Sequence, residues 1–561
     1  MDKRKACIFI VWFLCSLVLL NSLIASEENE QKQDYDLGRI VVIPDRWGVS
    51  EVRLSSNITV IDNQKIKASN AKYVADIIKE EAGINIYDNS SDKTAKVDIR
   101  GFADTSVSNV LVLVDGRRVN SIDISGPDWI QMPVEVIERI EILKGAGSVL
   151  YGDNAVGGVV NIVTKKGEGR SSGRIGVAGG SYNTQEEDLE FSGSDKNLSY
   201  YFYSKYYETD GYRKNSDLLS KDYNTRIGYN LGERLNLSLM AGLHRDDYGM
   251  PGGLDNIIEL DQYGRRGSTE ENDFASTKDR YIKFSLDASP QLKDIELGNF
   301  VVDVFYRNKD AYSWFYYGGF PTATKYMIDT RGITAKGMFN KDISGKEFKF
   351  ISGIDYYDTE HRINGSEWSS DDLTIYKKEL GAYIYSEYEM MDKFFLNVGA
   401  RNQKVKYRFD QRSPSSLYEA KSPGDSVFMG GIKYEYAEGS NLHLGIQETF
   451  RFLATDEWYS TWTGLNTGLK QQSGVQYEAG IKHNFGNIFL LNLTPYIMDI
   501  KNEIYVNPDP SPGRSENYDK TRRKGLELGI DVDVLKLLHI ALLDKMELSA
   551  NYTYQDPEFR G

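Results

Sequence analysis

The sequence predicts a mainly β protein: a transmembrane antiparallel β-barrel preceded by an amino-terminal α+β domain. From about residue 170 to the end, short segments recur in which apolar and polar residues alternate strictly, which puts one set on each face of a strand. No segment after residue 25 offers the roughly 20 apolar residues that a spanning helix needs. The chain has 38 Tyr against 23 Phe and 7 Trp, which suits a large wet or interfacial surface.

The same alternation would also fit a large soluble β-sandwich or propeller. Three features favour the barrel. The segments span about ten residues, the length with which a tilted strand crosses a bilayer. Their ends are rich in tyrosine, as at 200–212, which suits interfacial girdles, and no blade-length repeat is visible. Allowing roughly 20 residues for each strand and loop, residues 168–561 hold about 18–20 strands, close to the plugged 22-stranded class.

Charge and motif content exclude several function classes. The chain carries 82 acidic and 67 basic residues, a net charge of -15, which argues against binding a nucleic-acid backbone. It has no P-loop, dinucleotide fingerprint, nucleophile elbow or H-E-x-x-H motif. Its five histidines are scattered singly, as expected of wall residues rather than metal ligands. We therefore expect no enzymatic activity and no cofactor.

Residues 1–25 read as a signal peptide for Sec-dependent export. Basic residues 3–5 precede the apolar run Ala6–Leu20, and the small residues Ala25 and Ser26 follow. A membrane anchor is the alternative, but the run is shorter than the roughly 20 residues of a spanning helix. The only cysteines, Cys7 and Cys15, lie in this segment, so the exported chain would contain none.

Residues 26–50 form a polar leader with one β-prone segment, RIVVIP at 39–44. An apolar segment with flexible flanks can add as a strand to the edge of a partner's sheet. The alternative is that it forms an ordinary first strand of the domain that follows.

Residues 51–167 are predicted to be a compact mixed domain. A helix with one apolar face is expected within Asn70–Gly83, and Asn109–Val119 reads as a strand, a tight Asp-Gly turn and a return strand. Pro133 suggests a helix start, followed by a strand at Ile140–Leu143. In 145–166, GAGSVLYGDNAVGGVVNIVTKK, the glycines would let the chain turn sharply and pack closely before a last strand.

Residues 168–561 are predicted to be the barrel. The chain ends at YQDPEFRG, in a loop after a strand. Because no aromatic terminal strand follows, we expect the sequence to lack the last few strands of the barrel. Without them, an open barrel would leave unpaired strand edges in lipid, which is very costly.

Several stretches resemble TonB-dependent outer-membrane receptors. Val97–Phe102, Leu111–Asn120 and Val134–Lys166 are similar to the plug domain of this family. Similar barrel features follow at Thr449–Tyr459, Gln476–Phe485 and Arg522–Ile530. The resemblance implies a 22-stranded barrel with the plug in its lumen. The residues that carry the plug signature and its packing are Arg100, Gly101, Asp115, Gly116, Gly152, Gly157 and Gly158.

The resemblance also implies a function. Such a receptor imports a scarce metal chelate across the outer membrane of a Gram-negative-type bacterium. A ferric siderophore or other iron complex is the first candidate and cobalamin the second. Its partners would be the ligand, the outer-membrane lipid and TonB with its inner-membrane energising complex. TonB would bind the box formed by Arg39, Ile40, Val41, Val42 and Ile43. A passive porin-like channel and a surface adhesin are the other classes, and the plug and box signals argue against both.

Further site residues follow from the family pattern and from composition. On the plug, Arg139 and Lys144 are expected to face the barrel residues Glu478 and Glu527; separately solvated charges are the alternative. Aromatic residues in two segments are either ligand contacts or interfacial girdle: Tyr312, Trp314, Tyr316, Trp458 and Trp462. An acidic loop could hold calcium or could simply be solvated; its candidates are Asp246, Asp247, Asp255 and Asp261. No other metal site is expected.

Overall fold

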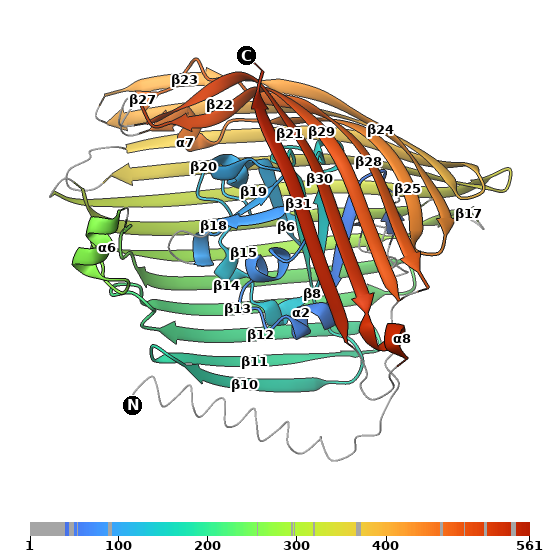
Figure 1. Cartoon of the computed structure of the whole chain (residues 1–561), viewed down its shortest axis with the longest axis horizontal. Coiled ribbons are helices and arrows are strands. Elements are labelled where there is room, and N and C mark those ends of the chain that lie inside the picture. Colours follow the sequence, from blue (N-terminus) through green and yellow to red (C-terminus); the bar gives the residue numbers. More distant parts are fainter. Residues whose placement is uncertain are drawn as a thin grey trace.

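The computed structural model places the chain in two β-rich units, one inside the other (Figure 1). It describes residues 40–43, 50–52, 54–87, 92–254, 256–292, 295–296, 298–317, 320–365, 372–413, 415–460, 464–486, 488–509, 513–539 and 546–560. The predicted signal peptide lies outside the described residues, and so do Arg39, Asp255 and Trp462.

The inner unit, which we call the plug, is built on a mixed five-stranded sheet of order β3-β8-β9-β6-β7, in which β6 and β9 are parallel. The strands of this sheet are β3 (Asn57–Asp62), β6 (Val110–Val114), β7 (Arg117–Arg118), β8 (Ile137–Lys144) and β9 (Gly158–Thr164). A separate two-stranded sheet pairs β4 (Ile84–Tyr87) with β5 (Lys96–Ile99). The helices of the plug are α2 (Asn63–Ala68), α3 (Val74–Ile78), α4 (Ser106–Asn109) and α5 (Ser148–Tyr151). The 3₁₀ turns are η1 (Asp92–Thr94), η2 (Ala103–Thr105), η3 (Trp129–Gln131) and η4 (Val134–Val136).

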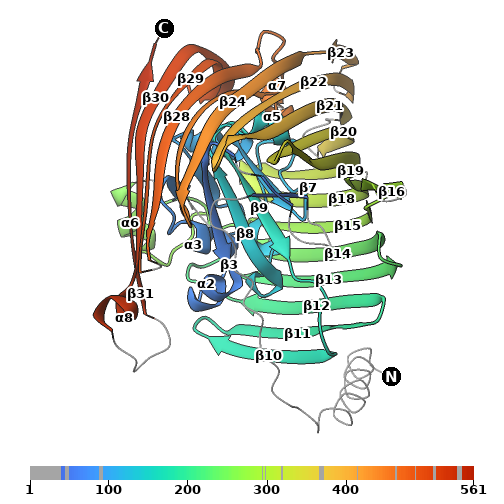
Figure 2. The ribbon, with the colours of Figure 1, turned by 90° about the vertical axis from the view of Figure 1, so that its right-hand side faces the viewer.

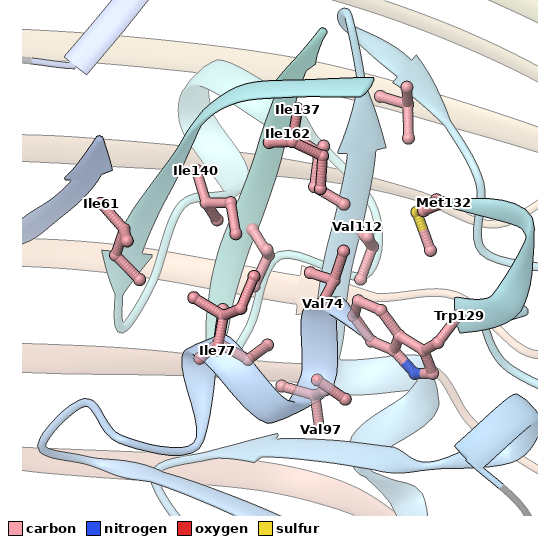
Figure 3. Close-up of a cluster of buried hydrophobic side chains, with 14 of the residues drawn as sticks. Ile61, Val74, Ile77, Val97, Val112, Trp129, Met132, Ile137, Ile140 and Ile162 are labelled. Carbon is pink, nitrogen blue, oxygen red and sulfur yellow. The ribbon is translucent and has the colours of Figure 1, made fainter. Parts of the chain in front are cut away.

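The plug has its own hydrophobic core between the sheet and α3 (Figure 3). Val74 and Ile77 of α3 are buried beside Val112 and Ile162 of the sheet. The fully buried Trp129 closes one side, where its ring nitrogen donates to the carbonyl of Ala95 at 2.7 Å. A core of this kind keeps the plug folded as a unit.

Local sequence explains most plug elements. The predicted Asp-Gly turn joins β6 to β7, with φ of 49° at Asp115 and 77° at Gly116, the two left-handed positions of a type I′ turn. The helix expected near Pro133 is wrong: only η4 forms there, and β8 begins at Ile137. β-branched residues dominate this stretch, and they favour the extended chain.

The outer unit is a single antiparallel sheet of 18 strands whose order follows the sequence from β10 to β31. Its first nine strands are β10 (Ser172–Gly180), β11 (Thr184–Asp195), β12 (Leu198–Thr209), β13 (Leu218–Leu231), β14 (Leu235–Gly249), β15 (Phe274–Ala288), β18 (Asn299–Tyr317), β19 (Phe320–Ile343) and β20 (Lys346–Gly365). The others are β21 (Asp372–Met391), β22 (Phe394–Ser413), β23 (Leu417–Lys421), β24 (Gly424–Ala437), β25 (Ser440–Arg451), β28 (Gln472–Phe485), β29 (Phe489–Asn507), β30 (Arg514–Asp533) and β31 (Glu547–Phe559).

The connections carry a few short elements. They are α6 (Ile257–Tyr263), β16 (Gln291–Leu292), β17 (Ile295–Glu296), α7 (Thr455–Trp458), β26 (Tyr459–Ser460), β27 (Gly464–Leu465) and α8 (Val534–Leu538). Ahead of the plug, β1 (Ile40–Ile43) pairs with β2 (Ser50–Val52). Within the described residues, no helix has the length and apolar content to cross a membrane.

The 18-stranded sheet curves around the plug, so that each strand has an inner and an outer face (Figure 2). Along β14, Ser238 and His244 are buried on the inner face, whereas Leu239 and Leu243 are exposed on the outer face. This is the predicted alternation, with apolar side chains outside and polar ones facing the lumen.

The connections at the two ends of the barrel strands differ in length. One end has short turns, such as residues 344–345 between β19 and β20, and the other has long loops, such as 250–273 and 452–471. Outer-membrane barrels keep short turns on the periplasmic side and long loops outside the cell. We call these the turn end and the loop end.

Candidate functional site

The interface between the plug and the barrel is the candidate functional site, because buried charges from both units meet there. Among the charge clusters that join the two units in the described residues, three are centred on Arg100, Lys93 and Lys377. Charges taken out of water must be paired and hydrogen-bonded to be tolerated, so each cluster fixes the position of the plug.

The backbone of the plug aims Arg100 at the barrel. Arg100 follows β5 with a left-handed φ of 67°. The Asp98 carboxylate holds this turn, because it accepts from the N–H groups of Phe102 at 2.8 Å and Ala103 at 3.0 Å. Burial raises the pKa of Asp98, and these backbone donors oppose the rise.

The guanidinium of Arg100 bridges two barrel glutamates, forming what we call the arginine cluster. Its Nε lies 2.9 Å from Glu527 and its Nη2 lies 2.7 Å from Glu478. From β3, the backbone N–H of Asn57 donates to Glu478 at 2.7 Å and its side chain to Glu527 at 2.6 Å. The ring of Tyr496 lies against the guanidinium, 4.1 Å from its carbon.

The predicted charge pairs are therefore corrected. Glu478 and Glu527 do face the plug, but Arg100 rather than Arg139 or Lys144 bridges them. Arg139 lies at the other end of β8, where its Nε donates to Glu141 of the same strand at 2.8 Å. Lys144 is buried at the end of β8 that pairs with Asn57.

The lysine cluster centred on Lys93 lies on another side of the plug. The ammonium group of Lys93 contacts Asp128 of the plug and Asp246 of the barrel. His244 bridges two barrel carboxylates, with Nδ1 2.7 Å from Asp222 and Nε2 2.8 Å from Asp246. Asp128, His244 and Asp246 place ligand atoms within 4.8 Å of one another, yet the Lys93 ammonium already takes the place of a cation there.

Among the described residues, the calcium candidates Asp246, Asp247 and Asp261 do not form a metal-ligand group with one another. Asp246 is fully buried in the lysine cluster, whereas the next residue, Asp247, lies on the opposite face of β14, 48% exposed. Asp261 is exposed on α6, and Asp255 is outside the described residues. Strand alternation puts Asp246 and Asp247 on opposite faces, so these two carboxylates cannot bind one ion together.

The third cluster joins the plug to a long loop. Lys377 of β21 lies 2.9 Å from Asp153, and the N–H of Phe452 donates to the same carboxylate at 2.9 Å. Glu379 lies 3.6 Å from Lys377. The Lys377 and Arg118 cations hold the pKa of Asp153 below its usual value, although burial opposes this.

At the loop end, the plug's apical loop, residues 121–126, also contacts loop 452–471. The N–H of Thr455 donates to the carbonyl of Ile122 at 2.9 Å. Burial, together with repulsion from Asp123, raises the pKa of the neighbouring Asp456 to about 8. Proton uptake by Asp456 thus accompanies this contact.

The aromatic candidates fall into two environments. Tyr312, Trp314 and Tyr316 alternate along the end of β18 in register with the exposed Val304 and Tyr306. The rings of Trp314 and Tyr316 meet edge to face, with 5.0 Å between their centres. This outer face corresponds to the girdle alternative rather than to ligand contact in the lumen.

Trp458 is buried instead of being displayed to a ligand. Its ring packs 5.3 Å from that of Tyr407 and 6.1 Å from that of Phe409, inside loop 452–471. It forms part of a hydrophobic cluster between that loop and the barrel wall. Trp462 lies outside the described residues.

Four of the five predicted plug glycines lie where a side chain would crowd its neighbours, whereas a Cβ at Gly116 would meet nothing within 4 Å. A Cβ at Gly158 would meet the carbonyl oxygen of Leu143 at 2.7 Å, and one at Gly157 would meet that of Ile99 at 2.5 Å. The other predicted glycines, Gly101, Gly116 and Gly152, have φ of 81°, 77° and 78°. These contacts agree with a packing role for the glycine run.

Sequence reasoning misses the partners of the buried cations. It does not single out Lys93, Asp128, Asp153 or Lys377, and it expects Arg100 only in packing. One available signal is that His244 and Asp246 occupy inward positions of an alternating strand. No local sequence pattern identifies their partners in the plug.

Two family models match this chain. The TonB-dependent receptor plug domain matches residues 50–159, and the TonB-dependent receptor-like β-barrel matches residues 169–561. Among curated proteins, the chain resembles the vitamin B12 transporter BtuB of Vibrio vulnificus, 28% identical over 42% of this chain. It also resembles BtuB of Photobacterium profundum, 29% identical over 30% of this chain. The matched segments cover 38% and 26% of those relatives.

Solved structures share the fold. The unliganded ferric citrate transporter FecA superposes with a TM-score of 0.78 at 18% identity, over 90% of this chain and 78% of that chain. The ferric yersiniabactin uptake receptor FyuA from Yersinia pestis gives a TM-score of 0.71 at 13% identity, over 90% and 79%. At these identities the likeness shows the architecture alone.

Proposed function

The chain belongs to the TonB-dependent receptor family, and we propose that it takes up a scarce metal chelate actively across the outer membrane. Members of this family are outer-membrane β-barrel proteins of Gram-negative bacteria, and they are receptors and transporters rather than enzymes. The observation that carries the proposal is the plug in the barrel lumen, tied to the wall by buried ion pairs.

This interface favours a gated receptor over the other two classes. A passive porin-like channel needs an open lumen, whereas here a folded domain with its own core lies inside the barrel. An adhesin needs only its loops and has no use for a plug held by polar contacts. When the plug moves, water can take the place of a charged group's partner at this interface. A continuous apolar seam would offer no such replacement.

An iron complex is the first candidate for the ligand and cobalamin the second. Two structural neighbours are described as a ferric citrate transporter and a ferric yersiniabactin receptor. The curated relatives favour the alternative, because both are described as vitamin B12 transporters.

Energy would reach the plug through strand addition. The segment Ile40–Ile43, followed by the plug, already adopts a β-strand that pairs with β2. TonB would replace β2 as its partner and transmit force along the chain. Ligand binding favours the exposed state of this segment only if the ligand binds that state more tightly.

Growth rescue tests the proposal. The gene is expressed in a host that lacks its own iron-chelate and cobalamin receptors, and single chelates are supplied as the only iron or cobalamin source. We expect ferric chelates to restore growth in a host with TonB and not in a matched host without it. Rescue by none of a panel of ferric chelates or cobalamin, despite normal amounts of receptor in the outer membrane, would refute the proposal.

A further inference from the structure

We infer, on the premise of this uptake function, that cargo crosses between the plug and barrel strands β18–β21, and that Arg118 closes this passage. The inference rests on two spaces at the plug–barrel boundary that lie in series along the same strands. β18, β19, β20 and β21 are neighbours in the sheet and lie side by side in Figure 1.

The larger space, which we call the lower cavity, has a volume of about 730 Å³. Plug strands β6 and β9 and barrel strands β11–β20 enclose it. It reaches the turn end of the barrel, at Lys196 and at Gly167–Gly169, the link from plug to barrel. Its volume falls within the range of roughly 300–1,000 Å³ that is typical of ligand sites.

The smaller space, the upper pocket, has a volume of about 50 Å³ and lies toward the loop end. It touches the apical loop at Ile122 and Asp123, and it touches loop 452–471 at Ala454. It is too small for a chelate, so the passage is closed in this structure.

Both spaces follow the same inward-facing rows of side chains. On β18, Phe305 and Arg307 line the upper pocket, and the next inward positions, Val301 and Asp303, line the lower cavity. On β19, Thr330 lines the upper pocket and Thr334 lines the lower cavity. The two spaces are therefore stacked along one stretch of wall.

Arg118 and Tyr357 line both spaces, so they form the partition. The guanidinium carbon of Arg118, on β7, lies 4.8 Å from the centre of the Tyr357 ring on β20. Its Nη2 donates to the carbonyl of Tyr151 at 2.8 Å, and its Nη1 lies 3.9 Å from Glu379. One plug side chain thus spans from the plug to the wall.

The contacts of Arg118 are weaker than those of the charge clusters. Its closest carboxylate is 3.9 Å away, compared with 2.7 Å and 2.9 Å for Arg100. Its side chain is 13% exposed, whereas that of Arg100 is fully buried. A pull on the plug would therefore free Arg118 before the arginine cluster breaks, and cargo would follow the widened path.

Conductance of the purified full-length receptor in a planar lipid bilayer tests this partition. Arg118→Ala removes the partition and a neighbouring cation of the third cluster, but the ion pairs made by Arg100, Lys93 and Lys377 stay. We therefore expect ion-conducting steps where the wild type has none. Tyr357→Ala, on the other side of the partition, should give the same result. Ions need much less space than a chelate, so this opening does not require the plug to be pulled.

Arg117→Ala provides the matched control. Arg117 is the neighbouring residue, and its guanidinium stacks on a barrel tyrosine in the same way, 3.9 Å from the ring of Tyr281. It lines neither the upper pocket nor the lower cavity. The Arg117→Ala receptor should stay silent.

A thiol then shows which route the ions take. Ser285 lines the lower cavity, whereas Asn492 lines a different cavity of about 600 Å³ at the turn end. Each cysteine is introduced into the Arg118→Ala receptor. A small methanethiosulfonate reagent should block the conductance of the receptor with Ser285→Cys but not that of the receptor with Asn492→Cys. The only native cysteines are Cys7 and Cys15, in the predicted signal peptide, so the exported parent offers no other thiol.

Folded Arg118→Ala and Tyr357→Ala receptors that both stay silent would overturn the inference, as would conductance that the Ser285 thiol does not block. Folding is checked by the heat-dependent shift of the barrel on a denaturing gel. These readouts use neither TonB nor a chelate. Failure of the uptake proposal would appear only in the growth test, and failure of the passage only in the bilayer.

Discussion

Arg100 holds two buried glutamates of the barrel at once, so its removal leaves both carboxylates without their cation. Breaking a buried ion pair from one side typically destabilises a protein by about 3–5 kcal/mol. We expect Arg100→Ala to lower the free energy of plug unfolding by an amount in this range. Urea dependence of tryptic cleavage within the plug measures it.

A surface pair supplies the comparison for Arg100. Lys524 and Glu558 lie 2.6 Å apart on the outside, with side chains 40% and 30% exposed. Lys524→Ala should change stability by at most about 1 kcal/mol, because water replaces the lost partner. Equal effects of the two substitutions would contradict the role assigned to the arginine cluster.

Gly158 tests the packing of the glycine run. A Cβ there would lie 2.7 Å from both the Leu143 carbonyl and the Ile99 side chain, so backbone must move to admit it. We expect Gly158→Val to destabilise the plug by about 1–3 kcal/mol, the usual range for overpacking. Gly169→Val is the control, because a Cβ there meets nothing within 4 Å, although its φ of 63° adds some strain. Protease resistance equal to wild type in Gly158→Val would count against close packing.

At the scale of elements, β1 is the segment proposed to bind TonB. Deletion of Ile40–Ile43 should abolish uptake and leave chelate binding at the cell surface intact. The arginine cluster, the lysine cluster and the third cluster remain, so the plug keeps its place in the barrel. Surface binding and accumulation of labelled chelate are measured on the same cells.

The alternative, that β1 is merely a structural strand, is tested through its partner β2. Glu51 pairs with Val41, and Glu51→Pro weakens this pairing without altering the segment itself. We expect uptake to persist in Glu51→Pro. If it falls as far as in the deletion, then pairing within the leader, rather than TonB binding, is what matters.

The contact between the apical loop and loop 452–471 should depend on pH. The pKa of Asp456 is about 8 in the folded protein and about 3.9 for an unperturbed aspartate. The folded state therefore binds more protons between these values, and the contact weakens as pH rises from about 4 to about 8. Faster hydrogen exchange of the Thr455 amide with rising pH, beyond the intrinsic rate, is the expected result.

Asp456→Asn should remove this pH dependence, because the amide does not titrate. Asp104→Asn serves as the control, since the Asp104 side chain is 87% exposed in the plug. A pH dependence that survives in Asp456→Asn would assign the effect to another group, such as Asp123.

At the scale of the whole molecule, the sequence predicts the β architecture because its signals are local. Alternation in β14 shows which side chains face the lumen, and the Asp115-Gly116 pair specifies a turn. The pairing of Arg100 with Glu527 could not be predicted in this way, because 427 residues separate them. Arg139 is also an arginine of the plug, and nothing in its local sequence distinguishes it from Arg100 as a partner for the barrel. Its Nε nevertheless donates to Glu141 of its own strand.

The same reasoning explains the aromatic and acidic candidates. Composition marks Trp458 and Asp246 correctly as unusual, but only the fold shows that one is buried in a loop core and the other binds a plug lysine. Whether a polar or aromatic residue meets a ligand or its own protein depends on which distant strand lies opposite.

We propose that this receptor drives a metal chelate inward with energy from TonB. The most direct measurement is the initial rate of accumulation of a radioiron-labelled chelate by cells that express it, with and without TonB. We expect saturable surface binding in both strains and accumulation only with TonB. Equal accumulation in the strain without TonB would mean that the protein is a passive channel and not a TonB-driven transporter.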